Sequence, residues 1–211
     1  MIPQWLAPVE AAARRVTNAD LSPLLPAPPE DARRAAVLML FAEGEQGPDL
    51  LFTERAPTLR SHAGQISFPG GALDESDPDE IFTALREANE EVGVEPTSVT
   101  PFATLPKLWL PPSNFAVTTV LGYWHEPHEV SPVDAAEVAS VFRVPIEELM
   151  NPAKRFTVVH HLGWQTPGFD VDHPTPLWGF TAGIVSRLFA AAGWEKPWDK
   201  TITRELDWIG D

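Results

Sequence analysis

Three glutamates, Glu87, Glu90 and Glu91, occupy positions i, i+3 and i+4 of one segment of the chain. In a helix, side chains at these positions project from the same face and lie close together. Neighbouring like charges on an exposed helix cost only about 0.2–0.5 kcal/mol per pair, so a solvated acidic face is one explanation. The alternative is that the carboxylates bind Mg²⁺ or Mn²⁺, hard cations that take oxygen ligands and often bridge to phosphate groups.

The segment that carries these glutamates has the sequence signals of a helix. Asp77 is placed to be the N-cap, Pro78 to be the first helical residue and Glu80 to complete a capping box. Gly93 suits a left-handed cap at the other end. Apolar residues recur between these signals at helical spacing, at Ile81, Ala84, Leu85, Ala88 and Val92. We therefore expect a helix over residues 78–92, which would bring the three carboxylates together.

The residues around the acidic cluster resemble a known family motif. The run Arg86-Glu87-Ala88-Asn89-Glu90-Glu91-Val92-Gly93-Val94 is similar at every position to the Nudix-box core R-E-U-x-E-E-x-G-U, in which U is apolar. The resemblance implies an α/β (α+β) Nudix fold, with a mixed β-sheet sandwiched between α-helices, and metal-dependent hydrolysis of a pyrophosphate bond. It also implies divalent-cation ligands at Glu87, Glu90, Glu91 and the Gly70 carbonyl, and an orienting salt bridge from Arg86.

The chain departs from the family pattern at one place. The general pattern has a glycine fourteen residues before the arginine and a glutamate eight residues before it, where this chain has Ala72 and Pro78. Gly71 lies fifteen residues before Arg86, so the loop is expected to be one residue longer. The supporting role of the missing glutamate would then fall to one of three nearby acids, Asp77, Asp79 or Glu80.

Two arginines upstream of the box indicate an anionic substrate. The run from Leu51 to Ala56, with Arg60, Gly64 and Phe68-Pro69-Gly70-Gly71, resembles the extra motif of the coenzyme A pyrophosphatase branch, with Phe52 in place of a leucine. Arg55 and Arg60 could bind phosphate oxygens through paired N–H groups, although spacing alone also allows surface ion pairs with Glu54 or other carboxylates. Glu54 itself is expected to be a surface residue. The resemblance implies cleavage of coenzyme A or its derivatives to adenosine 3′,5′-bisphosphate and 4′-phosphopantetheine, with Arg55, Arg60 and Gly71 at the substrate.

Hydrolysis requires a carboxylate that deprotonates or positions the attacking water. Glu90 and Glu91 are the candidates within the box, and Glu137 is an alternative from a distant segment. Two other hypotheses stay open: a Nudix hydrolase of another nucleoside diphosphate derivative, such as ADP-ribose, a dinucleotide or a nucleoside triphosphate, and a non-catalytic module that binds a phosphorylated ligand. The presence of all three glutamates argues against the module.

The composition excludes several classes of site. The 211 residues include 30 acidic and 15 basic side chains, a formal net charge of -15, which disfavours binding to nucleic acid. The absence of cysteine excludes disulfides, thiolate nucleophiles and cysteine-ligated zinc. Neither a signal-peptide pattern nor a run of about 18 apolar residues occurs, so we expect a cytoplasmic protein with a small-molecule substrate and no membrane contact.

The elements that must position the site follow from apolar patterns. Runs at 35–41 and 49–55, separated by turn residues, predict a β-hairpin, and further strands are expected at 99–105, 115–124, 141–144 and 157–164. Helices are expected to start at Pro145 and to span 181–192. Residues 1–30, which include a proline-rich run, are expected to form an arm packed on a domain of residues 31–211. This arm and the tryptophan-rich tail are peripheral apolar segments, so a homodimer is possible.

Overall fold

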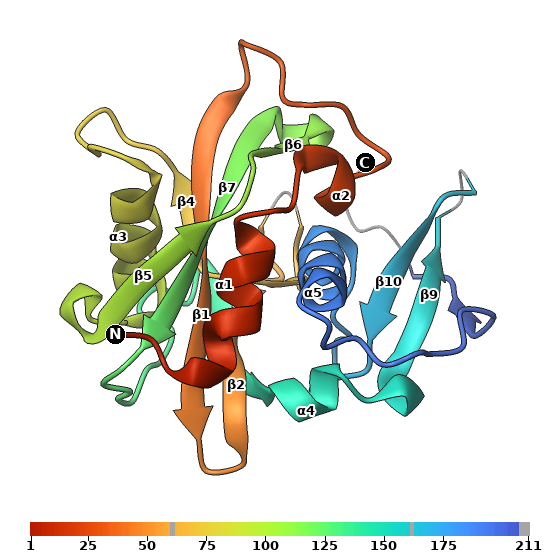
Figure 1. Ribbon diagram of the computed structural model, residues 1–211. Helices are drawn as coiled ribbons and strands as arrows, with labels where there is room; N and C mark the ends of the chain where they lie inside the picture. Colours follow the sequence, from red (N-terminus) through yellow and green to blue (C-terminus); the bar gives the residue numbers. More distant parts are fainter. Residues whose placement is uncertain (60–61, 161–162, 207–211) are drawn as a thin grey trace.

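The centre of the protein is a mixed β-sheet (Figure 1). The computed structural model describes residues 1–59, 62–160 and 163–206. The sheet has strand order β3-β2-β1-β7-β5, while β4 pairs with β1, β6 with β7 and β8 with β2. The strands are β1 Arg33–Gly44, β2 Gly47–Arg55, β3 Ile66–Ser67, β4 Gly70–Ala72, β5 Val99–Thr104, β6 Leu108–Leu110, β7 Phe115–Trp124 and β8 Val138–Pro145. Because β1 and β7 are parallel and their other neighbours are antiparallel, the predicted mixed sheet is confirmed.

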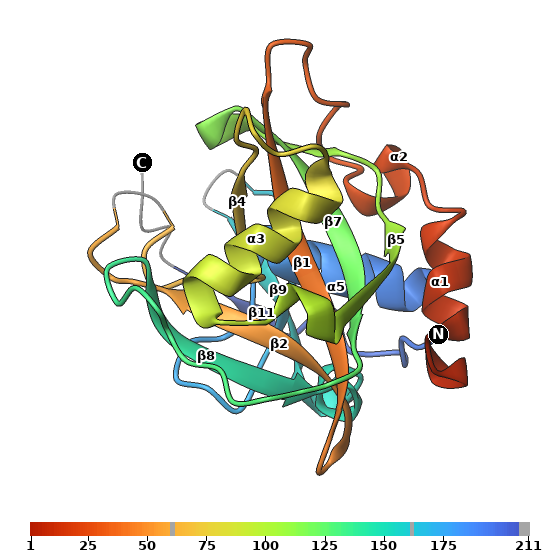
Figure 2. The same ribbon diagram turned by 90° about the vertical axis from the view of Figure 1, so that its left-hand side faces the viewer.

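Helices cover both faces of the sheet. Figures 1 and 2 show α3 (Glu80–Val92) on one face, and α1 (Ala7–Ala13) and α5 (Gly179–Ala191) on the other. Along β1, Leu38 and Leu40 belong to the core beneath α3, whereas Phe41 belongs to the core beneath α1 and α5. Side chains alternate between the faces of a strand, so covering both faces accounts for the uninterrupted apolar run at 35–41. The predicted arrangement of a sheet sandwiched between helices is therefore confirmed.

The predicted hairpin is also confirmed, since β1 and β2 are antiparallel with Gly44 opposite Gly47. The expected strand at 157–164 is wrong in its extent. Strand β9 (Arg155–Val159) ends before Gly163, whose φ of 88° marks a turn, and β10 (Gln165–Phe169) returns antiparallel to it. With β11 (Thr203–Arg204) these strands form a separate three-stranded sheet beside α5 (Figure 1).

The helix that carries the Nudix-like box starts two residues later than predicted. Asp79, not Asp77, is the N-cap of α3, and its carboxylate accepts a hydrogen bond from the Phe82 amide at 2.8 Å. The expected cap at Asp77 is wrong because its carboxylate is engaged by the side chain of Arg86 instead. Gly93, with a φ of 77°, is the predicted left-handed cap at the end of the helix.

The N-terminal segment completes the core beneath α5. It contains a short 3-10 turn at Gln4–Leu6, then α1 and α2 (Asn18–Leu21), and the side chains of Leu6, Val9 and Leu21 are buried. The division of the chain at residue 30 and a homodimer stay predictions. At the other predicted helix start, α4 spans Ile146–Leu149. In the part of the chain that the structure describes, no helix combines the length and the apolar character needed to cross a membrane.

Candidate active site

Glu91 is the most buried of the three box glutamates. Its residue exposure is 7%, and Oε2 accepts a hydrogen bond from the Gly70 amide at 3.0 Å. Burial raises the pKa of Glu91 to about 7; the Gly70 N–H and the charge of Arg55 oppose this rise, and the charges of Glu87 and Glu137 add to it. Glu91 is thus an interior carboxylate whose negative charge is only partly balanced by nearby groups. A divalent cation beside it would supply that balance.

The two glycines before the box allow β4 to pair with β1 and to lie close against α3. A Cβ atom on Gly70 would lie 2.3 Å from the Ala36 carbonyl oxygen, and one on Gly71 would lie 2.5 Å from the carboxyl carbon of Glu87. Real Cβ atoms do not approach other atoms this closely, so neither position accepts a side chain without movement. The Glu87 carboxylate therefore lies directly over Gly71, where burial raises its pKa against the opposing charge of Arg86.

Arg86 connects the acids of the site. Its Nη1 donates to Glu90 at 2.8 Å, and Nη2 lies 2.9 Å from a carboxylate oxygen of Glu87. Arg86 therefore forms ion pairs with two box glutamates, while its orienting role stays a prediction. Glu90 is the most accessible of them, since its side chain is 58% exposed. A metal ion bound by Glu87 and Glu90 would have to displace Arg86 from both carboxylates.

As placed, the acids do not converge on a single point. Among residues 1–59, 62–160 and 163–206, no three acidic or histidine side chains are arranged to hold a metal ion. The donor set nevertheless fits a hard divalent cation, because it consists of carboxylate oxygens within one turn of helix, and the charge of the buried one, Glu91, is only partly balanced. The ligand roles of Glu87, Glu90, Glu91 and the Gly70 carbonyl stay predictions.

Two residues from outside the box lie close enough to influence Glu91. Arg55 is the last residue of β2, and its positive charge lowers the pKa of Glu91. The Arg55 Nε atom is buried and has no hydrogen-bond partner among the described residues. A buried N–H group of this kind has an unmet hydrogen-bonding requirement. Glu137, from the connection between β7 and β8, adds a negative charge to the same region, and its carbonyl accepts from the Ala56 amide at 2.8 Å.

Arg60 and Gly71 are the other two residues predicted to contact the substrate. Arg60 lies outside the described residues, so its predicted role is not addressed by the structure. Gly71 lies against Glu87, as described above, and its role at the substrate stays a prediction. The structure therefore brings together Arg55, Gly70, Gly71, Arg86, Glu87, Glu90 and Glu91 from the predicted set.

Glu54 was expected to be a surface residue, and this expectation is wrong. Its side chain is 23% exposed and accepts hydrogen bonds from Ser140 Oγ at 3.1 Å and Thr175 Oγ1 at 3.2 Å, while Nε2 of His173 lies 3.6 Å away. The available signal was strand alternation, which puts Glu54 on the sheet face opposite to Arg55, beneath α5. Ser140 Oγ donates its single proton to Glu54, so that proton is not directed at Nε2 of His173. The cluster is therefore not arranged as a Ser-His-acid nucleophile site.

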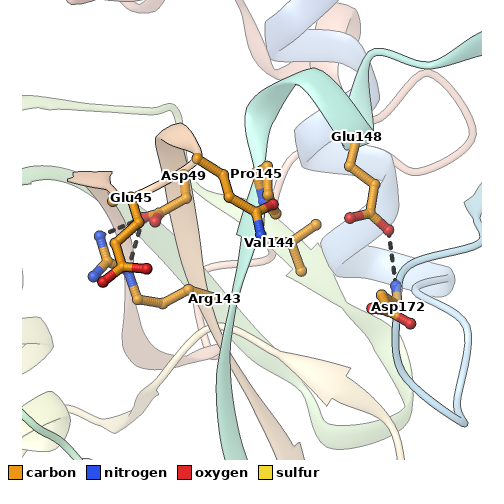
Figure 3. Close-up of a pocket in the computed structure, with 9 residues that line it drawn as sticks. Glu45, Asp49, Arg143, Val144, Pro145, Glu148 and Asp172 are labelled. Carbon is orange, nitrogen blue, oxygen red and sulfur yellow. Dashed lines mark hydrogen bonds and ion pairs between the residues drawn. The ribbon is translucent and has the colours of Figure 1, made fainter.

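A polar pocket of about 280 Å³ lies at the other end of β2 (Figure 3). Its wall includes Asp49 and Arg143, which form a hydrogen bond of 2.9 Å, and Glu148, which accepts from the Asp172 amide at 2.8 Å. Asp49 and Arg55 are six residues apart on an extended strand, a separation of about 20 Å. None of the predicted site residues lines this pocket. The pocket is therefore separate from the candidate active site.

Comparisons with known proteins agree with the geometry. Residues 32–168 match the family model of the NUDIX domain. The chain is 39% identical over 176 residues to an uncharacterized Nudix hydrolase, NudL, of Cronobacter sakazakii, covering 78% of this chain and 85% of that protein. It is 34% identical over 167 residues to a probable Nudix hydrolase of Schizosaccharomyces pombe, covering 78% of this chain but only 58% of that longer protein.

A solved structure has the same fold. The crystal structure of a Nudix hydrolase from M. smegmatis, RenU, aligns with a TM-score of 0.56 at 20% sequence identity, covering 80% of this chain and 91% of that one. At this identity the likeness concerns the fold alone. The family model spans well over half of the chain, and it includes the complete box from Arg86 to Val94. The chain therefore belongs to the Nudix family and is a pyrophosphohydrolase.

Proposed function

We propose that this Nudix enzyme hydrolyses the pyrophosphate bond of coenzyme A or its thioesters, using Mg²⁺ or Mn²⁺ held by Glu87, Glu90 and Glu91. The observation that carries the proposal is the position of Arg55. This residue belongs to the motif that resembles the coenzyme A pyrophosphatase branch, and its charge acts directly on the buried carboxylate of Glu91. A positively charged arginine near a carboxylate that fits a metal ion is suited to a diphosphate.

The roles of the side chains follow from their positions. A bound divalent cation would neutralise the diphosphate and make the attacking water more acidic. Glu90 or Glu91 accepts the water proton as the oxygen attacks phosphorus, and Glu137 is the alternative acceptor. The bridging P–O bond breaks, leaving adenosine 3′,5′-bisphosphate and 4′-phosphopantetheine. Arg55 holds phosphate oxygens throughout, while Arg86 restrains Glu87 and Glu90.

The experiment that tests this proposal is a substrate profile. Coenzyme A, ADP-ribose, a dinucleoside polyphosphate and a nucleoside triphosphate are each incubated with the protein and Mn²⁺, and kcat/KM is measured for each by chromatography of the products. The proposal predicts the highest kcat/KM for coenzyme A. A higher value for ADP-ribose or another nucleotide would keep the metal chemistry and replace the substrate. Cleavage of none of them would favour the binding-module hypothesis.

Replacing Arg55 by glutamine is expected to raise KM for coenzyme A about 10- to 100-fold. A hydrogen bond to a charged group contributes about 1.5–3 kcal/mol, and each 1.4 kcal/mol corresponds to a factor of about ten. The change is measured from initial rates over a range of coenzyme A concentrations at saturating Mn²⁺. Arg14→Gln is the matched control, because Arg14 is exposed and its ion pair with Glu10 lies on α1. An unchanged KM in Arg55→Gln would remove Arg55 from the substrate site.

A further inference from the structure

Asp77 is an acid outside the Nudix-box core that the fold buries against it. It lies in the loop between β4 and α3, and its side chain is 0% exposed. Its carboxylate accepts from Nε of Arg86 at 3.1 Å and from Nη2 at 2.9 Å. It also accepts from Thr83 Oγ1 at 2.9 Å and from the Asp74 amide at 3.1 Å. These bonds, chiefly those from Arg86, lower the pKa of Asp77 to about 2, so the buried group is a carboxylate.

One guanidinium therefore contacts four carboxylates, since Nη2 also lies 3.8 Å from a carboxylate oxygen of Asp74. Arg86 donates to Asp77 with one edge and contacts Glu87 and Glu90 with the rest of the group. The Asp77 side chain is fully buried, whereas the Glu90 side chain at the other end is 58% exposed. An ion pair with an exposed partner is weak and easily exchanged, whereas a paired buried carboxylate is costly to separate. The contact with Asp77 is thus the firm anchor of Arg86, and the contact with Glu90 is the exchangeable one.

We propose that Asp77 is a positioning residue that holds Arg86, so that Glu87 and Glu90 can leave the arginine and turn toward a divalent cation. The inference rests on the proposed function, because it assigns a task in metal binding. It also identifies the acid that takes the place of the missing box glutamate. Asp79 is committed to the cap of α3, and Glu80 is bonded to Arg34 and Lys107 on another side of the helix end. Asp77 contacts Arg86 directly.

In the proposed site, Arg86 and the divalent cation compete for the carboxylates of Glu87 and Glu90. Removing the charge of Asp77 changes this competition. In Asp77→Asn, the positive charge of Arg86 is balanced mainly by Glu87 and Glu90, because Asp74 lies farther away at 3.8 Å, so a cation must displace a more strongly held arginine. Residues that orient metal ligands without contacting the metal themselves typically contribute a factor of about 10–100 to metal affinity. We therefore expect the dissociation constant for Mn²⁺ to rise by about 10- to 100-fold in Asp77→Asn.

The test measures Mn²⁺ binding without substrate, by electron paramagnetic resonance of the free ion in titrations of the full chain. Asp79→Asn and Glu80→Gln are matched controls, because each removes one negative charge from the same end of α3. Both are expected to bind Mn²⁺ within about threefold of the unmodified protein. Circular dichroism and thermal unfolding confirm that each variant is folded. If Asp77→Asn does not fold, Thr83→Val, which removes one hydrogen bond from Asp77, is expected to weaken Mn²⁺ binding in the same direction.

A double-mutant cycle with Arg86→Gln separates positioning from a general structural effect. If Asp77 acts through Arg86, the effect of Asp77→Asn on Mn²⁺ binding disappears once Arg86 is replaced. Additive effects, or an unchanged dissociation constant in Asp77→Asn, would overturn the inference while leaving the proposed function intact. A failure of the unmodified protein to bind Mn²⁺ would overturn both the inference and the proposed function.

Discussion

Replacing Glu90 by glutamine is expected to lower kcat for pyrophosphate hydrolysis roughly 10²- to 10⁴-fold, the range by which a positioned acid or base accelerates a reaction. Glutamine has the same shape but neither accepts the water proton nor offers a charged ligand to a cation. The Glu90 side chain is 58% exposed and its ion pair with Arg86 lies at the surface, so the fold is expected to tolerate the change. The measurement is the initial rate at saturating coenzyme A and Mn²⁺.

Two further variants make this result specific. Glu95→Gln removes an exposed charge just beyond the helix and is expected to leave kcat unchanged. Glu137→Gln tests the alternative proton acceptor, whose charge also acts on Glu91. If Glu137→Gln abolished turnover while Glu90→Gln retained it, the proton acceptor would be Glu137. If neither substitution reduced kcat, the assignment of the base to these acids would be wrong.

The second large effect is expected from a single methyl group. Gly71→Ala would place a Cβ atom 2.5 Å from the carboxyl carbon of Glu87 and 2.6 Å from both of its oxygens. These atoms are the far end of a flexible side chain, so the carboxylate can move aside and the protein is expected to fold. A displacement of a catalytic group by about 1 Å can cost about 100-fold in rate. We therefore expect kcat/KM to fall roughly 100-fold, with thermal stability nearly unchanged.

Gly183→Ala is the matched control for Gly71→Ala. Gly183 lies within α5, and a Cβ atom there would meet nothing within 4 Å. Alanine favours a helix over glycine by about 1 kcal/mol, so this variant is expected to be slightly more stable and fully active. Activity and unfolding temperature are measured in parallel on both variants. Full activity in Gly71→Ala would show that the position of the Glu87 carboxylate is not critical, which contradicts the proposed site.

Local patterns predicted the parts of the molecule on which the proposed chemistry depends. The acidic helix, its glycine cap and the β1–β2 hairpin depend on contacts between residues close in sequence, and the structure has all of them. The same reasoning placed the helix cap at Asp77 because Asp, Pro and Glu there fit a capping box. Asp79 offered an equally good cap, and the choice was made by tertiary contacts of Asp77 with Arg86 and Thr83.

Contacts between distant segments account for the other differences. Strand alternation puts Glu54 on the face beneath α5, but its partners Ser140 and Thr175 are 86 and 121 residues away in sequence, so local patterns could not identify them. The approach of Arg55 and Glu137 to Glu91 depends in the same way on the pairing of β2 with β8. The turn at Gly163 was visible as a glycine within an apolar run, a signal that a strand can be interrupted. Treating this glycine as a break would have divided the predicted strand at 157–164 correctly.

The central claim is that this Nudix enzyme cleaves coenzyme A with the help of a divalent cation bound by its box glutamates. The most direct test incubates the purified protein with coenzyme A and either Mn²⁺ or EDTA, and follows adenosine 3′,5′-bisphosphate by chromatography. The account predicts that this product forms with Mn²⁺, does not form with EDTA, and is almost absent with Glu90→Gln. Product that forms equally well in EDTA, or no product from coenzyme A in the presence of Mn²⁺, would contradict it.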